Sequence, residues 1–170
     1  MNVFKPLDII KNLKVLRREV EELIEMHGLN HNQLMLQTYG EGVDNWYEGV
    51  GRIDQLPHKI EHEYKFINDS LKDSNLESLI NRYSGTRARI MVLNSTMCYT
   101  LHSDPTPRIH IPIVTNKKCM MCWPEQNFMT TMPAGMSYWT DTTHPHTFFN
   151  ASEQQRIHIV MCSDLEFYSS

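Results

Sequence analysis

Three residues between positions 102 and 146 have the types and the spacing of a metal site. His102 and Asp104 are separated by one residue, and His146 follows 44 residues after His102. Residues i and i+2 of a β-strand project from the same face, so His102 and Asp104 can point at one ion. The third ligand must then come from another strand, where His144 and His146 compete for the role.

Two histidines and one carboxylate on one side of a metal form the facial triad of non-haem Fe(II) oxygenases, which leaves coordination positions open. Arg156 lies ten residues after His146. Its guanidinium is always charged and can hold a carboxylate through two parallel hydrogen bonds. Together these residues indicate a pocket that binds a divalent metal and a carboxylate-bearing ligand.

Length and composition limit the classes of protein that this sequence can represent. The 170 residues are 41% hydrophobic and 21% charged, with a formal net charge of −4. One domain over residues 1–170 is expected for a chain of this size. Lysine and arginine are scattered, so we expect no nucleic-acid partner. No apolar run is long enough to span a membrane, and residues 1–6 lack the apolar core of a signal peptide, which predicts a cytoplasmic protein without a membrane partner. The sequence predicts no particular oligomeric state.

The four cysteines include one CxxC pair, formed by Cys119 and Cys122. A structural zinc site usually combines two such pairs, and the sequence contains no second one. Buried free thiols are therefore the expected state of these residues.

Residues 1–86 are predicted to form a helical cover with a candidate lid. Apolar residues at spacings of three and four predict a helix over 6–27, and residues 58–83 favour two shorter helical pieces. Ser74, followed three residues later by Glu77, predicts a capped start for the second piece. Residues 40–51 hold four of the seven glycines and Trp46, so this segment either closes over a ligand or is an ordinary loop with an aromatic anchor.

Residues 87–164 are predicted to form the core that carries the metal site. Short strands at close spacing after a helical start indicate a mainly β protein built from two sheets. The predicted strands cover residues 89–93, 97–102, 108–114, 119–123, 127–131, 136–139, 147–149 and 156–161.

Two of these strands begin with the same four residues, Arg-Ile-His-Ile, at positions 108–111 and 156–159. On a strand, arginine and histidine share one face and the two isoleucines share the other. Isoleucine favours hydrophobic cover. We expect the isoleucines to pack beneath the N-terminal helices, and the arginines and histidines to line a polar interior. The alternative places the arginines and histidines in solvent.

Several stretches within residues 87–164 resemble the aspartyl/asparaginyl β-hydroxylase-like family of Fe(II)/2-oxoglutarate-dependent oxygenases. The resemblance implies a double-stranded β-helix, that is, a cupin-like jelly roll, with Fe(II), the cosubstrate 2-oxoglutarate and molecular oxygen. It also implies hydroxylation of an unactivated carbon. The stretches that carry it are the HxD motif at 102–104, the run at 108–116, the turn at 133–135 and the runs at 146–150 and 156–158.

Residue by residue, the resemblance implies that His102, Asp104 and His146 bind iron. His146 is preferred to His144 because an asparagine and an arginine then fall at the family's offsets of four and ten. It also implies that Arg156 binds the far carboxylate of 2-oxoglutarate. Asp104 makes the chain more similar to the bacterial amino-acid hydroxylases of this family than to the animal enzyme, which lacks the acidic ligand.

The resemblance places Arg108 and His110 near the cosubstrate and the substrate. A buried guanidinium needs a partner, so Arg108 binds a substrate anion, shares the 2-oxoglutarate carboxylate or pairs with a protein acid. Arg87 or Arg89 could add further positive charge. These residues predict a small carboxylate-bearing substrate, most simply a free amino acid. The candidate substrate-binding residues are His110, Trp123, Arg89 and Trp46, with the two tryptophans as an apolar wall.

Other functions fit parts of the same pattern. The enzyme could hydroxylate Asp or Asn residues in a protein or peptide. A cupin-like metal-binding protein that does not use 2-oxoglutarate would keep the triad but would not need Arg156. A non-enzymatic β-barrel would need neither, and the ordered offsets of the motif argue against it.

Overall fold

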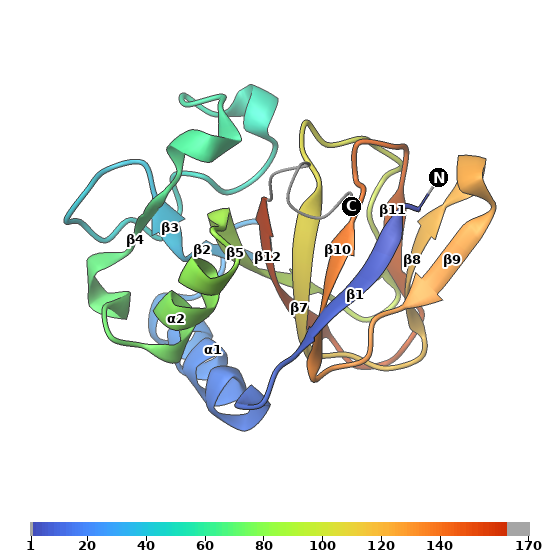
Figure 1. Cartoon of the computed structure of the whole chain (residues 1–170), viewed down its shortest axis with the longest axis horizontal. Coiled ribbons are helices and arrows are strands. Elements are labelled where there is room, and N and C mark those ends of the chain that lie inside the picture. Colours follow the sequence, from blue (N-terminus) through green and yellow to red (C-terminus); the bar gives the residue numbers. More distant parts are fainter. Residues whose placement is uncertain (1, 163–170) are drawn as a thin grey trace.

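Two facing antiparallel β-sheets form the body of the protein, as a computed structural model that describes residues 2–162 shows (Figure 1). Residues 163 and 164 of the predicted core lie outside the described residues. The larger sheet has the order β1 (Phe4–Ile9), β10 (Met136–Thr140), β7 (Arg108–Val114), β12 (Arg156–Cys162), β5 (Thr86–Leu93) and β2 (Gln33–Met35). The smaller sheet has the order β6 (Met97–Cys98), β11 (Thr147–Asn150), β8 (Cys119–Trp123) and β9 (Phe128–Thr131).

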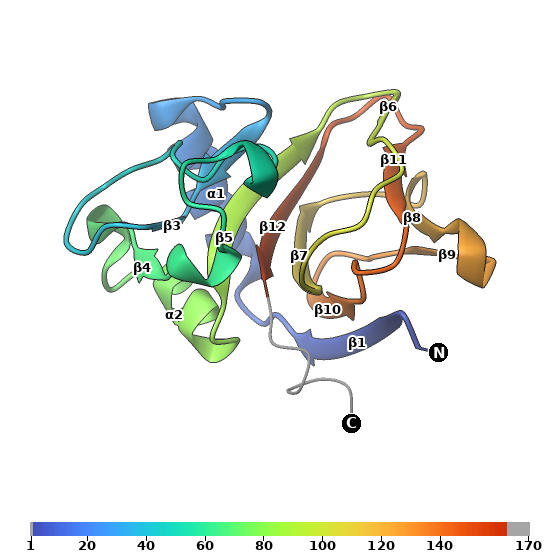
Figure 2. The same cartoon turned by 90° about the horizontal axis from the view of Figure 1, so that it is seen from above.

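The remaining elements come from the N-terminal half of the chain and lie on the outer side of the six-stranded sheet (Figure 2). They are α1 (Leu13–His27), α2 (Asn75–Arg82), the short pair β3 (Gln37–Thr38) and β4 (Phe66–Ile67), and the 3-10 helices Ile53–Gln55, Glu61–Glu63 and Asp69–Leu71. A further 3-10 helix, Pro124–Gln126, connects β8 to β9.

The two Arg-Ile-His-Ile strands lie side by side, because β12 pairs with β7 on one edge and with β5 on the other. The four isoleucines of the repeat are almost fully buried in one apolar cluster with residues of α1 and α2. This confirms the expectation that the helices cover the isoleucine face. The opposite face of β7 and β12 is left to the space between the two sheets.

The predicted helix over 6–27 is wrong in its first part. Phe4–Ile9 forms the edge strand β1, in which Pro6 is aligned with Tyr138 of β10. An edge strand tolerates proline because a missing backbone N–H there interrupts no central ladder. The helix α1 begins only at Leu13, and it ends before Gly28, which adopts a positive φ of 72° and donates its N–H to Ile24.

The capped start at Ser74 is confirmed, because its side chain accepts a hydrogen bond of 3.0 Å from the backbone N–H of Glu77. The helix that follows, α2, buries its apolar face. The first helical piece expected within residues 58–83 is absent from the described structure. The chain there makes only 3-10 turns and the strand β4, and one of these turns carries the buried Glu61.

The segment 40–51 has the properties of an anchored loop. Trp46 is 8% exposed, belongs to the main apolar cluster and stacks on His27 with ring centroids 4.1 Å apart. Its carbonyl also accepts a hydrogen bond from the backbone N–H of Met35. An aromatic residue held in this way fixes the loop to the core, which favours the anchor over the lid.

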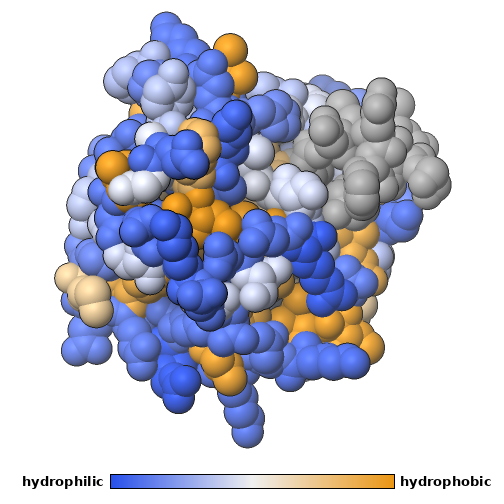
Figure 3. All heavy atoms as spheres, turned by 60° about the vertical axis from the view of Figure 1, so that its left-hand side comes forward, coloured by the Kyte–Doolittle hydropathy of each residue, from blue (hydrophilic) through white to orange (hydrophobic). Residues whose placement is uncertain are grey.

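The surface formed by the N-terminal elements is mainly hydrophilic, with apolar residues in small separate groups (Figure 3). Charged residues of α1, such as Arg17, Glu21 and Glu25, are exposed to solvent. Within residues 2–162, no helix combines the length and the apolar character needed to span a membrane.

Candidate active site

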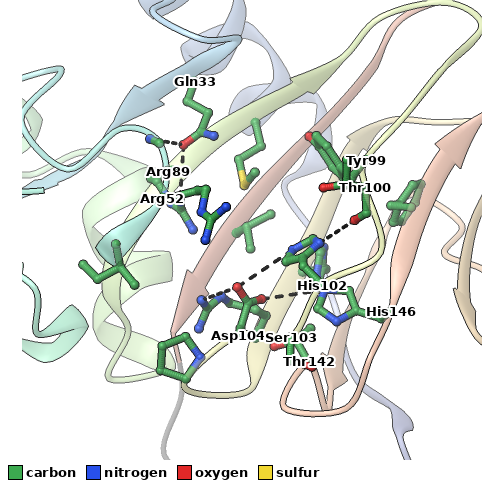
Figure 4. A pocket seen from close by; sticks show the side chains of 18 of the residues that line it. Gln33, Arg52, Arg89, Tyr99, Thr100, His102, Ser103, Asp104, Thr142 and His146 are labelled. Atoms are coloured by element: carbon green, nitrogen blue, oxygen red, sulfur yellow. Dashed lines mark hydrogen bonds and ion pairs between the residues drawn. The ribbon is translucent and has the colours of Figure 1, made fainter. Parts of the chain in front are cut away.

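The three residues of the predicted metal site come together at the edge of the small sheet. His102 and His146 form a β-bridge that continues the pairing of β6 with β11, through reciprocal backbone hydrogen bonds of 3.1 and 2.9 Å. The backbone N–H of Asp104 donates to the carbonyl of Thr142 at 2.8 Å. One ligand atom from each of the three side chains lies within 4.8 Å of those of the other two. Figure 4 shows the three side chains pointing toward one another.

Hydrogen bonds set the orientation of both imidazole rings. Nδ1 of His102 lies 2.7 Å from the carbonyl oxygen of Thr100, and Nδ1 of His146 lies 3.0 Å from that of His144. A carbonyl only accepts, so each Nδ1 carries a hydrogen, and in the neutral imidazole the lone pair is then on Nε2. Each Nε2 lies within 4.0 Å of a carboxylate oxygen of Asp104. Burial lowers the pKa of His146, which favours the neutral imidazole that a metal requires.

His144 lies outside this group. Its Nε2 is 3.7 Å from a carboxylate oxygen of Asp141, on the loop between β10 and β11. His144 and His146 are two residues apart, so local spacing alone could not separate them. The bridge between His102 and His146 brings His146, and not His144, to Asp104.

The triad borders a cavity of about 650 Å³ between the two sheets. This volume lies within the range of pockets for small ligands. Tyr99 and Phe148 give it aromatic walls, and the segment Gly51–Asp54 closes one side. The arginines Arg87, Arg89, Arg108 and Arg156 also line it, together with His110 and Met121.

Arg156 is a buried cation without a carboxylate partner among the described residues. It is 1% exposed, and one terminal nitrogen donates to the hydroxyl of Tyr99 at 3.2 Å. Its guanidinium carbon lies 4.4 Å from the centre of the Phe148 ring, and its Nε has no hydrogen-bond partner in residues 2–162. Burial lowers the pKa of Arg156. Such a group requires an anion to offset its desolvation.

Arg108 is paired with protein acids, which is one of the alternatives that the sequence left open. Its two terminal nitrogens lie 2.7 and 3.0 Å from the carboxylate oxygens of Glu61, and one of them is 3.1 Å from Asp104. Burial acts to raise the pKa of Glu61, but Arg108, Thr106 and Arg87 lower it to about 2. The charge of Arg108 is thus already compensated within the protein, which favours its pairing with protein acids over the predicted role in binding the cosubstrate.

Arg89 points into the cavity with little compensation. It is 5% exposed and donates to the side-chain oxygen of Gln33 at 3.0 Å, while its Nε is without a partner in the part of the chain that the structure describes (Figure 4). Burial lowers the pKa of Arg89 to about 9, and the positive charges of Arg87 and Arg108 contribute. Arg87 itself is satisfied, because it binds Glu61 and the carbonyl oxygens of two glycines.

His110 lies on the cavity wall as expected, with its Nδ1 3.4 Å from Nδ1 of His158. The predicted tryptophan wall is wrong, because neither Trp123 nor Trp46 lines the cavity. Trp123 is fully buried in a second apolar cluster and donates its indole N–H to the carbonyl of Asp141. Each of these two tryptophans fills an apolar core instead, and the apolar lining of the cavity includes Tyr99, Phe148 and Met121.

Sequence reasoning missed Glu61, Gln33 and Tyr99. A buried glutamate carries no local signal, since its burial depends on arginines that lie 26 and 47 residues further along the chain. Tyr99 belongs to a predicted strand, but nothing in the sequence context of Tyr99 or of Gln33 distinguishes either one from residues outside the site.

Solved structures share this fold over nearly the whole chain. AviO1 from Streptomyces viridochromogenes Tue57 is 14% identical, with a TM-score of 0.55, and the match covers 96% of this chain and 90% of that one. A viral collagen prolyl hydroxylase from Paramecium Bursaria Chlorella virus-1 is 11% identical in a truncated form, with a TM-score of 0.53 and coverage of 95% and 91%. Its 2OG complex is 10% identical, with a TM-score of 0.52 and coverage of 96% and 97%. At these identities the likeness shows the jelly-roll fold.

No curated protein sequence matches the chain. The model of the aspartyl/asparaginyl beta-hydroxylase family, in contrast, matches residues 11–164. This match includes most of the N-terminal half, which the resemblance within residues 87–164 did not reach. The chain therefore belongs to the aspartyl/asparaginyl β-hydroxylase family and is a 2-oxoglutarate-dependent hydroxylase.

Proposed function

We propose that this enzyme is an Fe(II)- and 2-oxoglutarate-dependent dioxygenase that hydroxylates an unactivated carbon of a small carboxylate-bearing substrate, most simply an amino acid. One observation carries the proposal. The cavity beside the triad also contains two buried arginines, Arg89 and Arg156, that have no carboxylate partner within the described residues.

His102, Asp104 and His146 would hold the iron. Two neutral imidazoles and one carboxylate on one side of the ion are the donor set of the facial triad. Bound Fe(II) and 2-oxoglutarate supply the oxygen chemistry, and the protein supplies placement. The carbonyls behind each Nδ1 fix the direction of both Nε2 atoms before any metal arrives.

Arg156 would bind the far carboxylate of 2-oxoglutarate. Its guanidinium is held by Phe148 and by the hydroxyl of Tyr99, contacts that leave its buried charge without an acid. A carboxylate bound by such a group in a low-dielectric site gains a strong charge-assisted pair.

Arg89 would bind a carboxylate of the substrate. Four buried arginines line the cavity, whereas only two carboxylates, Glu61 and Asp104, contact them directly among the described residues. Arg156 is aligned with Leu93 and Val160 with Arg89, so the two unpaired arginines lie four strand positions apart. At about 3.3 Å per residue, they are about 13 Å apart along the strand direction. They therefore offer two separate anion positions, one for the cosubstrate and one for the substrate.

The cosubstrate is tested by anaerobic titration of the protein with Fe(II) and 2-oxoglutarate. We expect the weak visible charge-transfer band of the chelated complex. Metal binding without this band would favour a cupin-like protein that does not use 2-oxoglutarate.

The substrate is tested with a panel of free amino acids and close analogues. A substrate should stimulate succinate production above the uncoupled background, and Arg89→Ala should remove that stimulation while the background remains. Arg52→Ala is a matched control, because this arginine also lines the cavity but is exposed and paired with Asp54.

A second candidate substrate is an Asp or Asn residue in a peptide, and the rim of the site favours it. The side chain of His102 is 42% exposed, and the neighbouring Leu101 is 58% exposed. An open, partly apolar rim could receive a chain longer than a free amino acid. Stimulation by an Asp- or Asn-containing peptide, with none from the full amino-acid panel, would select this candidate.

A further inference from the structure

Glu61 reaches the site from outside both sheets. It lies in the 3-10 helix Glu61–Glu63 of the N-terminal half, yet it is only 3% exposed. One carboxylate oxygen accepts from Arg87 and Arg108, each at 2.7 Å, and the other accepts from Thr106 at 2.7 Å and Arg108 at 3.0 Å. A carboxylate with four such contacts is held in one position.

Arg108 connects this carboxylate to the metal site. One terminal nitrogen of Arg108, Nη2, donates to Oε1 of Glu61 and also lies 3.1 Å from Oδ1 of Asp104. Glu61 thus contacts both terminal nitrogens of Arg108, whereas Asp104 contacts only one of them. If Glu61 were neutral, Asp104 would be the only carboxylate left on Arg108 within residues 2–162, and the pair would compete with the metal for Asp104.

Arg87, the second arginine that donates to Glu61, connects this carboxylate to the wall of the cavity. Arg87 donates to the carbonyls of Gly49 and Gly51, at 3.0 and 2.7 Å for its terminal nitrogen. Gly51 begins the segment that closes one side of the cavity. A single carboxylate therefore holds both a neighbour of the metal ligand and a wall of the pocket.

We propose that Glu61 is a positioning residue, which acts through Arg108 to keep the Asp104 carboxylate oriented and available for the metal. This inference rests on the metal site of the proposed function. Groups that orient metal ligands typically contribute 10- to 100-fold to metal affinity. A purely structural glutamate would instead stabilise the fold and leave the metal affinity of the folded protein unchanged.

The experiment is a Mn(II) titration of the folded, full-length protein under anaerobic conditions, followed by electron paramagnetic resonance. Glu61→Gln keeps the shape of the side chain but removes its charge, and we expect Mn(II) affinity to fall by about 10- to 100-fold. Glu63→Gln is the matched control, because Glu63 lies in the same 3-10 helix and makes none of the four contacts above. Its Mn(II) affinity should equal that of the wild type.

Arg108→Gln shows whether Glu61 acts through Arg108. In that background, adding Glu61→Gln should lower Mn(II) affinity by much less than it does in the wild type, because coupled residues are non-additive. Fully additive losses, or a wild-type affinity in Glu61→Gln, would overturn the positioning role. A wild-type protein that binds no Mn(II) would instead contradict the proposed function.

Glu61→Asp provides the comparison if Glu61→Gln does not fold. Aspartate keeps the charge but is one methylene shorter, so it reaches the two arginines less well. We expect an Mn(II) affinity between those of the wild type and the glutamine variant. An unchanged affinity in a folded Glu61→Asp protein, measured at a pH where the carboxylate is ionised, would count against the proposal.

Discussion

The two Arg-Ile-His-Ile stretches on β7 and β12 are identical in sequence and adjacent in space, but their arginines have opposite surroundings. Arg108 contacts two carboxylates, Glu61 and Asp104. Arg156 contacts an aromatic ring and a hydroxyl, and no carboxylate within the described chain. The motif determines which face of the sheet each arginine occupies. The neighbouring residues determine whether its charge is paired within the protein or available to a ligand.

The histidines of the two stretches differ as well. His110 lines the cavity, whereas His158 is fully buried behind it and packs edge-on against Phe148. Burial lowers the pKa of both well below the ordinary value, and Arg156 lowers each further. Both rings therefore stay neutral at physiological pH. The two strands thus present one arginine that is paired with carboxylates and one that is not to the same cavity.

The largest expected effect is the loss of the proposed metal site, which borders the same cavity as these arginines. His102→Ala, Asp104→Ala and His146→Ala should each lower Fe(II) affinity and abolish succinate production, with the far-ultraviolet circular dichroism retained. His144→Ala is the matched control and should change little, because its imidazole lies against Asp141. Loss of iron binding in His144→Ala, with none in His146→Ala, would show that the third ligand is wrongly assigned.

The next prediction compares the effect of the same substitution, arginine to methionine, on the free energy of unfolding when it is made on β7 and on β12. Arg108→Met should lower the free energy of unfolding by about 3 kcal/mol, because it breaks a buried ion pair. Arg156→Met should leave it unchanged or raise it, because a buried guanidinium without an acid is replaced by an apolar chain of similar length. Urea unfolding without metal or 2-oxoglutarate measures both. Equal losses in the two variants would contradict the difference between the strands.

A similar contrast concerns the cosubstrate. Arg156→Lys keeps the charge but loses the two-pronged geometry, and a bidentate pair is worth roughly 1.5–3 kcal/mol. The 2-oxoglutarate concentration required for half-maximal succinate production should therefore rise about 10- to 100-fold. Arg108→Lys should shift this concentration less. An unchanged requirement in Arg156→Lys would remove Arg156 from the cosubstrate site.

The last contrast depends on pH, because Arg108 on β7 has an acidic partner, Glu61, whereas Arg156 on β12 contacts no carboxylate within the described residues. The pKa of Glu61 falls from 4.5 to about 2 on folding, so its ionised form favours the folded state. The stability difference between wild type and Glu61→Gln should be complete above pH 4.5 and should shrink as the pH falls toward 2. The difference between wild type and Arg156→Met should stay nearly constant over this range. Thermal unfolding at a series of pH values distinguishes the two patterns.

Much of the secondary structure of this protein could be predicted from the local periodicity of its sequence. Alternation placed the strands of residues 87–162 and assigned the faces of β7 and β12, because side-chain direction in a strand is a property of neighbouring residues. The HxD spacing predicted that His102 and Asp104 can share one ion, and in the structure both side chains lie near His146, although Asp104 is outside any strand. Ser74 caps its helix through a contact three residues away. The family resemblance added the fold and the cosubstrate.

Only the tertiary structure decided which distant residues meet. The strand β1 was missed because its apolar spacing also fits a helix, and its pairing partner β10 begins more than 120 residues later. The acid that holds Arg108 is 47 residues away in the other half of the chain. Trp46 and Trp123 carry an apolar surface that suits a pocket or a core equally well. Whether a buried arginine is paired depends on which segments fold against it, and this long-range placement separates Arg108 from Arg156 despite their identical local sequence.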